Sequence, residues 1–488
     1  MSSQVAWLSL TLLAVVDEPA RPAPDPIAIV TALETALERA VAAAEPSVVG
    51  IARIRNGPGG ETTAVRKGKG GIVRKGKGAD APQAIPDDLQ AFDFGAGVVV
   101  GDDGAILTAF HVVKGASQIV VRARGHKQFE AEVIAADPRS DLAVIAPKVE
   151  PGGKPPALRP IAIGDASTLR KGAFLLALGN SFNAMRVDQN PDRGPEHPRD
   201  GEASASWGIL SNVARRIDPE AYQEVRGPVR PLRLYPTLLQ LDTKLNLGMS
   251  GGAVVNLKGE LVGITTTTGA VAGADAMAGY AIPMDALGRR VVATLREGKE
   301  VEYGFLGVGL SAEPSNRISD INPATPAGQA GLIEGDLIVA VGGRPVTDSD
   351  SLTLALSTLP VGQRVTLKIE RDGRAIDKTI VLSKCPVPGE VIATNRPEPW
   401  RGLRVDYTSI LPDGVSSDVI LKALAAGGVR VVEVAPGSEA DRAGLRAGQI
   451  VTAVDDTAVR SPAEFRAAVA GRRGPVRLAT EDGPVVVK

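Results

Sequence analysis

The sequence has few cysteines, histidines and aromatic residues, and each shortage narrows what the protein can be. A single cysteine among 488 residues excludes an intrachain disulfide, so the fold does not depend on oxidation. That residue, Cys385, lies at a predicted strand end beside Pro386, which disfavours a catalytic thiol. Aromatic residues make up 3% of the chain and hydrophobic residues 44%, so the cores must consist of Val, Leu, Ile and Ala. The 55 glycines and 36 prolines supply the turns of a β-rich chain, whose length favours about three domains.

An excess of one charge is also missing. Lys and Arg number 55 against 56 Asp and Glu, so no global field attracts nucleic acid or an acidic membrane. The three histidines, His111, His126 and His197, do not cluster, and no Cys/His spacing fits a metal site. We therefore expect neither a metal nor a cofactor.

A basic sequence, Arg-Lys-Gly-Lys-Gly, occurs at residues 66–70 and again at 74–78. We interpret it as a solvated loop; a contact with a polyanion or with lipid head groups is the alternative. No aromatic residue is interleaved for base stacking, which argues against nucleic acid.

One serine is placed as a nucleophile requires. Ser250 lies between glycines in residues 246–253, ahead of a predicted strand, a turn at residues 256–259 and a second strand. In so small a loop, neighbouring backbone N–H groups can converge on a developing oxyanion.

The serine needs a base and an orienting carboxylate. His111 ends an apolar strand that starts at Ile106, and Asp141 lies in a turn that runs into another apolar strand. The Gly-x-Ser-x-Gly pattern also fits the nucleophile elbow of α/β-hydrolases, which requires a helix after the serine and a later histidine. Here a strand pair follows Ser250 and no histidine does, so that fold is excluded. The order His, Asp, Ser is the chymotrypsin-like one.

Three segments, residues 108–113, 140–144 and 248–252, resemble the catalytic motifs of the HtrA/Deg family of PDZ-containing serine proteases. Further matches are residues 94–98, 177–180 and 208–211, so the resemblance spans most of residues 30–290. It implies an ATP-independent endopeptidase that cleaves unfolded or misfolded proteins in protein quality control. A peptide-binding holdase or scaffold with weak or latent proteolysis is the alternative function.

The C-terminal part of the chain contains a repeat. Residues 323–338 return as 436–451, and both copies resemble the signature segment of PDZ domains. The predicted fold class is mostly β, a chymotrypsin-like double β-barrel protease domain followed by two PDZ domains. The domain bounds that we expect are 1–26 for a leader or signal peptide, 27–297 for the protease, 300–386 for the first PDZ domain and 400–488 for the second. Residues 387–399, broken by prolines, are the predicted linker.

The N-terminal region contains two predicted elements and a targeting signal. Residues 6–16 form an apolar run that is too short to span a bilayer and suits a signal peptide, so we expect export to the periplasm and no stable membrane span. A disordered leader is the alternative. Residues 27–45 read as a helix that Pro46 stops, with Val30, Leu33, Leu37 and Val41 on one face, and residues 48–54 as the first barrel strand.

The resemblance also implies roles for single residues. His111 is the general base, Asp141 orients it, and the backbone of Gly248, Met249 and Ser250 surrounds the oxyanion, with the N–H groups of Gly248 and Ser250 as donors. Met249 stands where the family usually has Asn, but its side chain donates nothing in this mechanism.

Substrate choice is predicted from the segments around the nucleophile. The pocket residues that we expect are Leu245, Ile264, Thr265 and Thr266. Asp242 is the one nearby acid. Trypsin selects basic residues with an acid at a fixed distance before its serine, and at that distance before Ser250 this chain has Lys244. We therefore predict cleavage after Val, Ala, Ile or Leu.

The first PDZ domain opens with a sequence that resembles a carboxylate-binding loop: Tyr303, Gly304, Phe305, Leu306 and Gly307. Its expected partners are peptide C-termini, besides the unfolded polypeptides that the protease cleaves. The second domain opens less clearly, at residues 401–405, so a scaffold role is as well supported there. The family forms trimers or multiples of them, often through N-terminal aromatic residues; between Trp7 and Phe92 this chain has none, which disfavours that route to a homo-oligomer.

Overall fold

The structure is a computed structural model, and eleven stretches of it are described. They are residues 25–54, 94–125, 127–183, 185, 202–213, 237–266, 279–311, 315–323, 325–385, 391–410 and 427–488. Residues 1–24 of the predicted leader, the basic repeat at 66–78, His126 and His197 lie outside the described residues.

The first barrel consists of six antiparallel strands. They are β1 (Val48–Ile54), β2 (Phe94–Val99), β3 (Ile106–Ala109), β4 (Gln118–Ala123), β5 (Lys127–Asp137) and β6 (Leu142–Pro147). The strand order is β5-β4-β1-β2-β3-β6, and β5 also pairs with β6, which closes the sheet into a barrel. Val, Ile and Ala side chains fill its interior, as the shortage of aromatic residues requires.

The second barrel is also closed and six-stranded. Its strands are β7 (Phe174–Gly179), β8 (Ser204–Asn212), β9 (Leu239–Leu241), β10 (Ala253–Val255), β11 (Leu261–Thr266) and β12 (Gly279–Pro283). The predicted turn joins β10 to β11, with the N–H of Gly259 donating to the Asn256 carbonyl at 2.9 Å. The predicted double β-barrel is confirmed.

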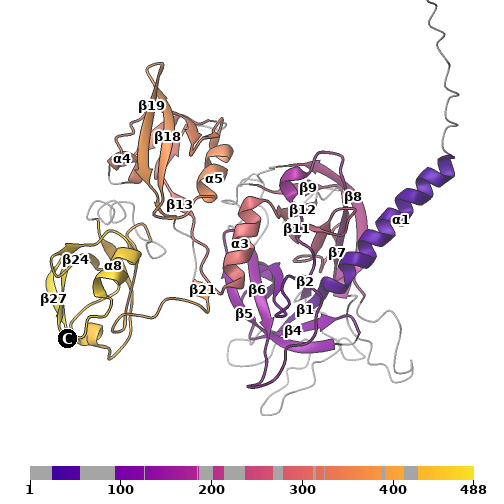
Figure 1. The fold of residues 1–488 in the computed structure, drawn as a ribbon, viewed down its shortest axis with the longest axis horizontal. Helices are drawn as coiled ribbons and strands as arrows, with labels where there is room; N and C mark the ends of the chain where they lie inside the picture. The colour runs from indigo at the N-terminus through magenta and orange to yellow at the C-terminus, as the bar shows by residue number, and fades with distance from the viewer. Residues whose placement is uncertain are drawn as a thin grey trace, which may run out of the picture.

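Two longer helices accompany the barrels (Figure 1). α1 (Pro26–Ala44) begins with a proline after Asp25, whose carboxylate accepts the N–H of Ile27 at 3.1 Å. Its C-terminal half packs on the core through Leu37 and Val41, but Val30 is 65% exposed, so only half of the predicted apolar face is covered. α3 (Ala286–Arg296) packs against the first barrel after the last strand. Single 3-10 turns are η1 (Glu45–Ser47), η2 (Ala166–Thr168) and η3 (Ser181–Asn183).

The first C-terminal unit has its own apolar core. Its elements are β13 (Gly304–Phe305), β14 (Val308–Leu310), β15 (Ile318–Ile321), α4 (Pro326–Gln329), β16 (Leu337–Val341), β17 (Arg344–Pro345), α5 (Ser349–Ser357), β18 (Arg364–Arg371), β19 (Arg374–Val381) and β20 (Ser383–Lys384). The repeated segment forms α4 and β16, and Thr325 caps α4 through its hydroxyl.

The second unit repeats this arrangement around a separate core. It contains β22 (Leu403–Tyr407), β23 (Val429–Val434), α7 (Glu439–Arg442), β24 (Ile450–Val454), β25 (Thr457–Ala458), α8 (Pro462–Val469), β26 (Val476–Thr480) and β27 (Gly483–Val487). Ser438 caps α7 as Thr325 caps α4, so the two copies of the repeat fold alike. The two units lie on one side of the barrels in Figure 1.

The predicted linker is not a free connection. Within it, β21 (Ile392–Ala393) pairs with the edge of β5 in the first barrel, Ile392 opposite Ala136 and Ala393 opposite Ala135. The N–H of Asn395 also donates to the Gly298 carbonyl at 2.9 Å. The sequence did not indicate this strand, because two residues beside prolines carry no strand pattern.

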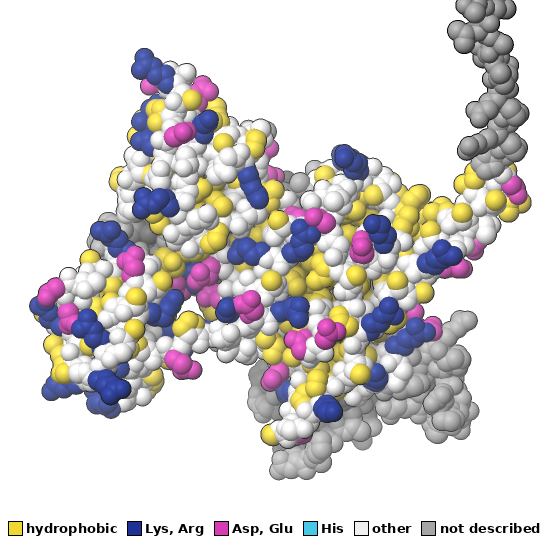
Figure 2. Space-filling view, viewed as in Figure 1, with side chains coloured by type: hydrophobic (Ala, Val, Ile, Leu, Met, Phe, Trp, Pro, Cys, Tyr) yellow, Lys and Arg dark blue, Asp and Glu magenta, His cyan; other side chains and the backbone are white. Residues whose placement is uncertain are grey.

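The distribution of charge on the surface agrees with the balanced numbers of acidic and basic residues. Figure 2 shows acidic and basic side chains interspersed over the visible face. Among the described residues, no helix is both long enough and apolar enough to cross a membrane.

Candidate active site

The turn after β5 and the end of β3 bring a carboxylate and an imidazole together. Asp141 Oδ1 accepts the backbone N–H of His111 at 2.9 Å, and Asp141 Oδ2 lies 2.7 Å from His111 Nδ1. The two contacts fix both the position and the tautomer of the ring, so Nε2 is left as the basic nitrogen. His111 lies in a short helix, α2 (Phe110–Val113), and not at a strand end as predicted.

Two side chains support this pair in roles that the sequence did not indicate. Thr266, on β11 of the second barrel, places its hydroxyl 3.2 Å from Asp141 Oδ2. Arg53, at the end of β1, donates from Nη1 to the carbonyls of His111 and Lys114, both at 2.9 Å. The first contact crosses from one barrel to the other, which only the folded chain can reveal.

The charge of Asp141 favours the protonated form of His111. Burial lowers the pKa of His111, but the charge of Asp141 and its hydrogen bond outweigh this effect, and the pKa is raised above 6.5. The charged imidazolium is therefore stabilised where a proton has to be accepted during catalysis.

Ser250 lies at the seam between the two barrels. Its carbonyl accepts the N–H of Ala96 on β2 at 2.8 Å, and the N–H of Gly251 donates to Thr265 on β11 at 2.8 Å. Ser250 thus bonds the first barrel, and Gly251 bonds the second. Because Ala96 is on the strand beside β3, this places the serine loop next to the segment that presents His111.

Two glycines of this loop are required by their surroundings. Gly248 has φ 90°, and a Cβ there would lie 2.2 Å from the Asn180 carbonyl oxygen. Gly251 has φ 82°, and its Cβ would lie 2.2 Å from the Ala96 carbonyl oxygen. Both contacts involve backbone atoms, which cannot yield without moving the main chain.

The N–H groups of Gly248 and Ser250 are the predicted oxyanion donors, and Met249, between them, bonds within the loop. The N–H of Met249 donates to the Asn246 carbonyl at 3.1 Å, which closes a turn. Gly248 and Ser250 remain the candidate donors. The side chain of Met249 is buried, in keeping with a packing role.

The predicted substrate pocket needs correction. Ile264, Thr265 and Thr266 are each 0% exposed. Ile264 belongs to the core, Thr265 donates its hydroxyl to the Met249 carbonyl, and Thr266 bonds Asp141, so none of them forms an open pocket wall. Leu245 is half-buried and packs beside Gly279 on β12, the remaining candidate of the four.

The residues of the predicted carboxylate-binding loop differ in their surroundings. Tyr303 is 0% exposed and donates its hydroxyl to Asp137 of the first barrel, so its side chain does not face a peptide groove. Gly304 and Phe305 pair with β20. Leu306 is buried in the domain core, and Gly307 turns the chain into β14 with φ 79°.

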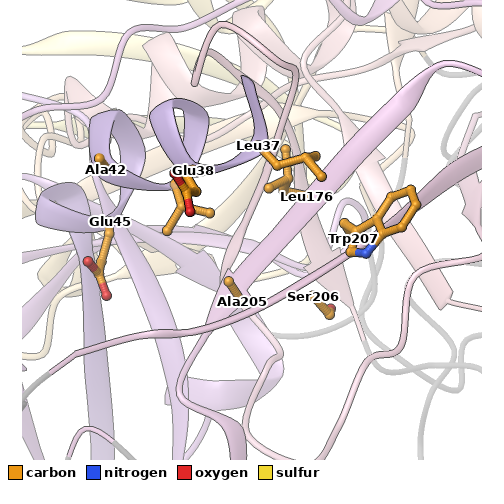
Figure 3. A pocket seen from close by; sticks show the side chains of 9 residues that line it. Leu37, Glu38, Ala42, Glu45, Leu176, Ala205, Ser206 and Trp207 are labelled. Atoms are coloured by element: carbon orange, nitrogen blue, oxygen red, sulfur yellow. The ribbon is translucent and has the colours of Figure 1, made fainter. Parts of the chain in front are cut away.

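A hollow of about 380 Å³ lies elsewhere on the molecule, between α1 and the outer face of β7 and β8. Figure 3 shows Leu37 and Leu176 within it and Trp207 at its rim. None of the residues His111, Asp141 and Ser250 lines it, so it is separate from the candidate active site. Among the described residues, no three His, Cys, Asp or Glu side chains gather in a way that could hold a metal ion.

Comparisons with known families agree with this architecture. A model of the trypsin-like peptidase domain matches residues 95–264, which include all three candidate catalytic residues. Two PDZ domain models match residues 304–382 and 430–480.

Related proteins cover most of the chain. It is 30% identical over 404 residues to a probable periplasmic serine endoprotease DegP-like of Halomonas elongata, which covers 79% of this chain and 76% of the relative. It is 29% identical over 386 residues to the periplasmic serine endoprotease DegP of Escherichia coli, at 76% and 71% coverage. A solved structure of the HtrA-type protease AlgW with tripeptide has a TM-score of 0.51 at 23% identity, covering 72% of this chain and 98% of that one, and supports the fold alone.

Proposed function

Because the chain belongs to the HtrA/DegP family of periplasmic serine endoproteases, we propose that His111, Asp141 and Ser250 are its catalytic triad. The chain is a serine endopeptidase of the periplasm, with a role in protein quality control. The observation that carries the triad is the double contact of one carboxylate with His111, at its backbone N–H and at Nδ1.

The reaction follows from these positions. His111 Nε2 takes the proton of the Ser250 hydroxyl as the oxygen attacks a peptide carbonyl, and Asp141 stabilises the resulting imidazolium. The N–H groups of Gly248 and Ser250 stabilise the oxyanion, and loss of one such donor costs about 3 kcal/mol of transition-state stabilisation. His111 then protonates the leaving amine, and water repeats the sequence on the acyl-enzyme. No step requires ATP.

We propose Leu245 as one wall of a shallow pocket that takes aliphatic side chains. Its half-buried side chain lies against a glycine of β12 and offers no charge. Asp242 and Lys244 are both exposed and of opposite sign, so neither selects a charged residue alone. Cleavage after Val, Ala, Ile or Leu is expected, and mass spectrometry of products from an unfolded substrate measures it; a majority of cuts after Arg or Lys would contradict the pocket.

For the first PDZ domain, which we assign to residues 300–386, we propose capture of peptide C-termini. Among the described strands β14 pairs with β15 alone, so its other edge can accept an added strand. The loop at residues 305–307 leads directly into that edge. Calorimetry with a free peptide and its C-terminally amidated twin tests the assignment, because equal affinities would exclude carboxylate recognition.

We further propose that the protease domain spans residues 27–297 and the second PDZ domain residues 400–488, and that the chain assembles into a trimer or a multiple of it. Light scattering of the purified chain measures the assembly state.

The function is tested by digestion of unfolded casein with wild-type protein and the Ser250→Ala variant. Cleavage by the wild type alone supports the triad. Suppression of aggregation without cleavage by either protein would favour the holdase alternative.

A further inference from the structure

A second carboxylate closes the turn that presents Asp141. Asp137, the last residue of β5, accepts the backbone N–H of Arg139 at 3.2 Å and that of Ser140 at 3.1 Å. Asp141 follows with φ 55°, a left-handed conformation that is uncommon for a residue other than glycine. The Asp137 side chain therefore helps to fix the direction in which Asp141 points toward His111.

Two segments from outside the barrel hold this same end of β5. β21 pairs there through Ile392 and Ala136. Tyr303, directly ahead of β13, donates its hydroxyl to Asp137 Oδ2. Asp137 is nearly inaccessible, and burial raises the pKa of its carboxyl against the lowering effect of the hydrogen bonds from Ser140 and Tyr303. A buried carboxyl group of this kind needs its donors, and Tyr303 supplies the one that comes from another domain.

The Tyr303 ring is itself fixed by two guanidinium groups. The Cζ atom of Arg139 lies 4.2 Å from the ring centroid, and that of Arg290, on α3, lies 5.4 Å from it. Both arginines also bond Ser357 at the end of α5: Arg139 Nη2 reaches its hydroxyl at 3.3 Å, and Arg290 Nη2 its carbonyl at 2.8 Å. The contact thus joins the turn of Asp141 to the first PDZ domain.

We propose that Tyr303 is a positioning residue of the protease, whose hydroxyl acts through Asp137 to set the orientation of Asp141. The inference rests on the proposed triad. Three hydrogen bonds form the path, from Tyr303 to Asp137, from the Ser140 amide to Asp137, and between Asp141 and His111. The peptide bond between Ser140 and Asp141 joins the second to the third. A side chain that only packed the domains together would need its ring, which the arginines hold, and not its hydroxyl.

Tyr303→Phe separates the two roles, because it keeps the ring and deletes the hydroxyl. With the full chain, we expect kcat on a short chromogenic peptide and the rate of inactivation by diisopropyl fluorophosphate to fall about tenfold, since small misplacements of a catalytic group are costly. KM should change less than about twofold. The acid limb of the pH–rate profile should move to lower pH, because a displaced Asp141 no longer raises the pKa of His111.

A matched control and a second variant sharpen the test. Tyr407→Phe removes a hydroxyl from the second PDZ domain and should change none of these quantities. Asp137→Asn should lower kcat by itself, and adding Tyr303→Phe to it should lower kcat no further, because the hydroxyl acts through Asp137. All rates are measured below the melting transition of each variant, as recorded by circular dichroism.

Three results would overturn the proposal: an unchanged kcat in Tyr303→Phe, an unmoved acid limb, or a further loss of full size when Tyr303→Phe is added to Asp137→Asn. Failure of the wild-type protein to react at Ser250 would instead contradict the proposed function. The two failures are therefore distinguishable.

Discussion

Replacing Lys384 with methionine should destabilise the contact between the two PDZ domains by several kcal/mol. Lys384 ends the first domain, and its Nζ lies 2.7 Å from Glu300 Oε1 and 2.7 Å from Asp406 Oδ2. The side chain is 4% exposed, while Glu300 and Asp406 are 27% and 16% exposed. Glu302, at 3.5 Å, is more exposed and adds less.

The magnitude follows from what the substitution leaves behind. Burial lowers the pKa of Lys384, but the charges of Asp406 and Glu300 raise it further, so the ammonium group is fully charged near pH 7 and its stabilisation is present there. Removal leaves two half-buried carboxylates facing each other without a cation. Breaking a buried pair in this way costs about 3–5 kcal/mol.

Lys299→Met is the matched control. Its Nζ lies 2.6 Å from Glu297 Oε2, but both side chains are more than half exposed, so the loss should be about 1 kcal/mol or less. Urea unfolding, followed by circular dichroism, measures the loss of stability in both variants. Thermal unfolding, followed by differential scanning calorimetry, measures it independently. Equal losses for Lys384→Met and Lys299→Met would refute the reasoning.

The pH dependence provides a further check on the same cluster. Burial raises the pKa of Glu300, and Lys384 opposes that effect. Without Lys384 the folded-state pKa of Glu300 rises further above its unfolded value, so the folded state binds the proton more tightly. The stability gap between wild type and Lys384→Met should therefore narrow as the pH falls and Glu300 becomes protonated.

Three other predictions concern the active site. Gly248→Ala should abolish casein cleavage without changing peptide affinity of the first PDZ domain, because its Cβ would lie 2.2 Å from the Asn180 carbonyl oxygen; cleavage above a tenth of the wild-type rate would contradict this. Asp141→Asn should lower kcat about 10,000-fold. The acid limb of kcat/KM reports deprotonation of His111, whose pKa is raised by Asp141, so the limb should move to lower pH in this variant. Thr266→Val deletes a donor to Asp141 and should lower kcat about tenfold at constant KM in steady-state assays, and an unchanged kcat would show that the 3.2 Å contact has no role.

Features set by local pattern could be predicted from the sequence. The helix expected at residues 27–45 is Pro26–Ala44, and the strand expected at 48–54 is Val48–Ile54, because a 3.6-residue period and an apolar run are local signals. The order of His111, Asp141 and Ser250 also indicated the double barrel, since the chain order of the three residues distinguishes protease folds.

Features that depend on distant contacts could not be predicted. Tyr303 lies in a sequence typical of a peptide-binding loop, yet its hydroxyl bonds Asp137, 166 residues away. Thr265 and Thr266 follow the nucleophile as pocket residues would, but the folded strand directs one hydroxyl to the serine loop and the other to Asp141. The partner of Tyr303 lies in another domain and that of Thr266 in the other barrel, while that of Thr265 lies in the serine loop, 16 residues away. No local pattern encodes these contacts.

The central claim is that Ser250 is the nucleophile activated by His111, and a fluorophosphonate probe tests it most directly. Peptide mapping of the labelled wild-type protein should place one adduct on Ser250. Ser250→Ala should give no adduct and no cleavage of casein while keeping the wild-type melting temperature, and His111→Ala should label far more slowly. An adduct on another residue, or casein cleavage by Ser250→Ala near the wild-type rate, would contradict the account.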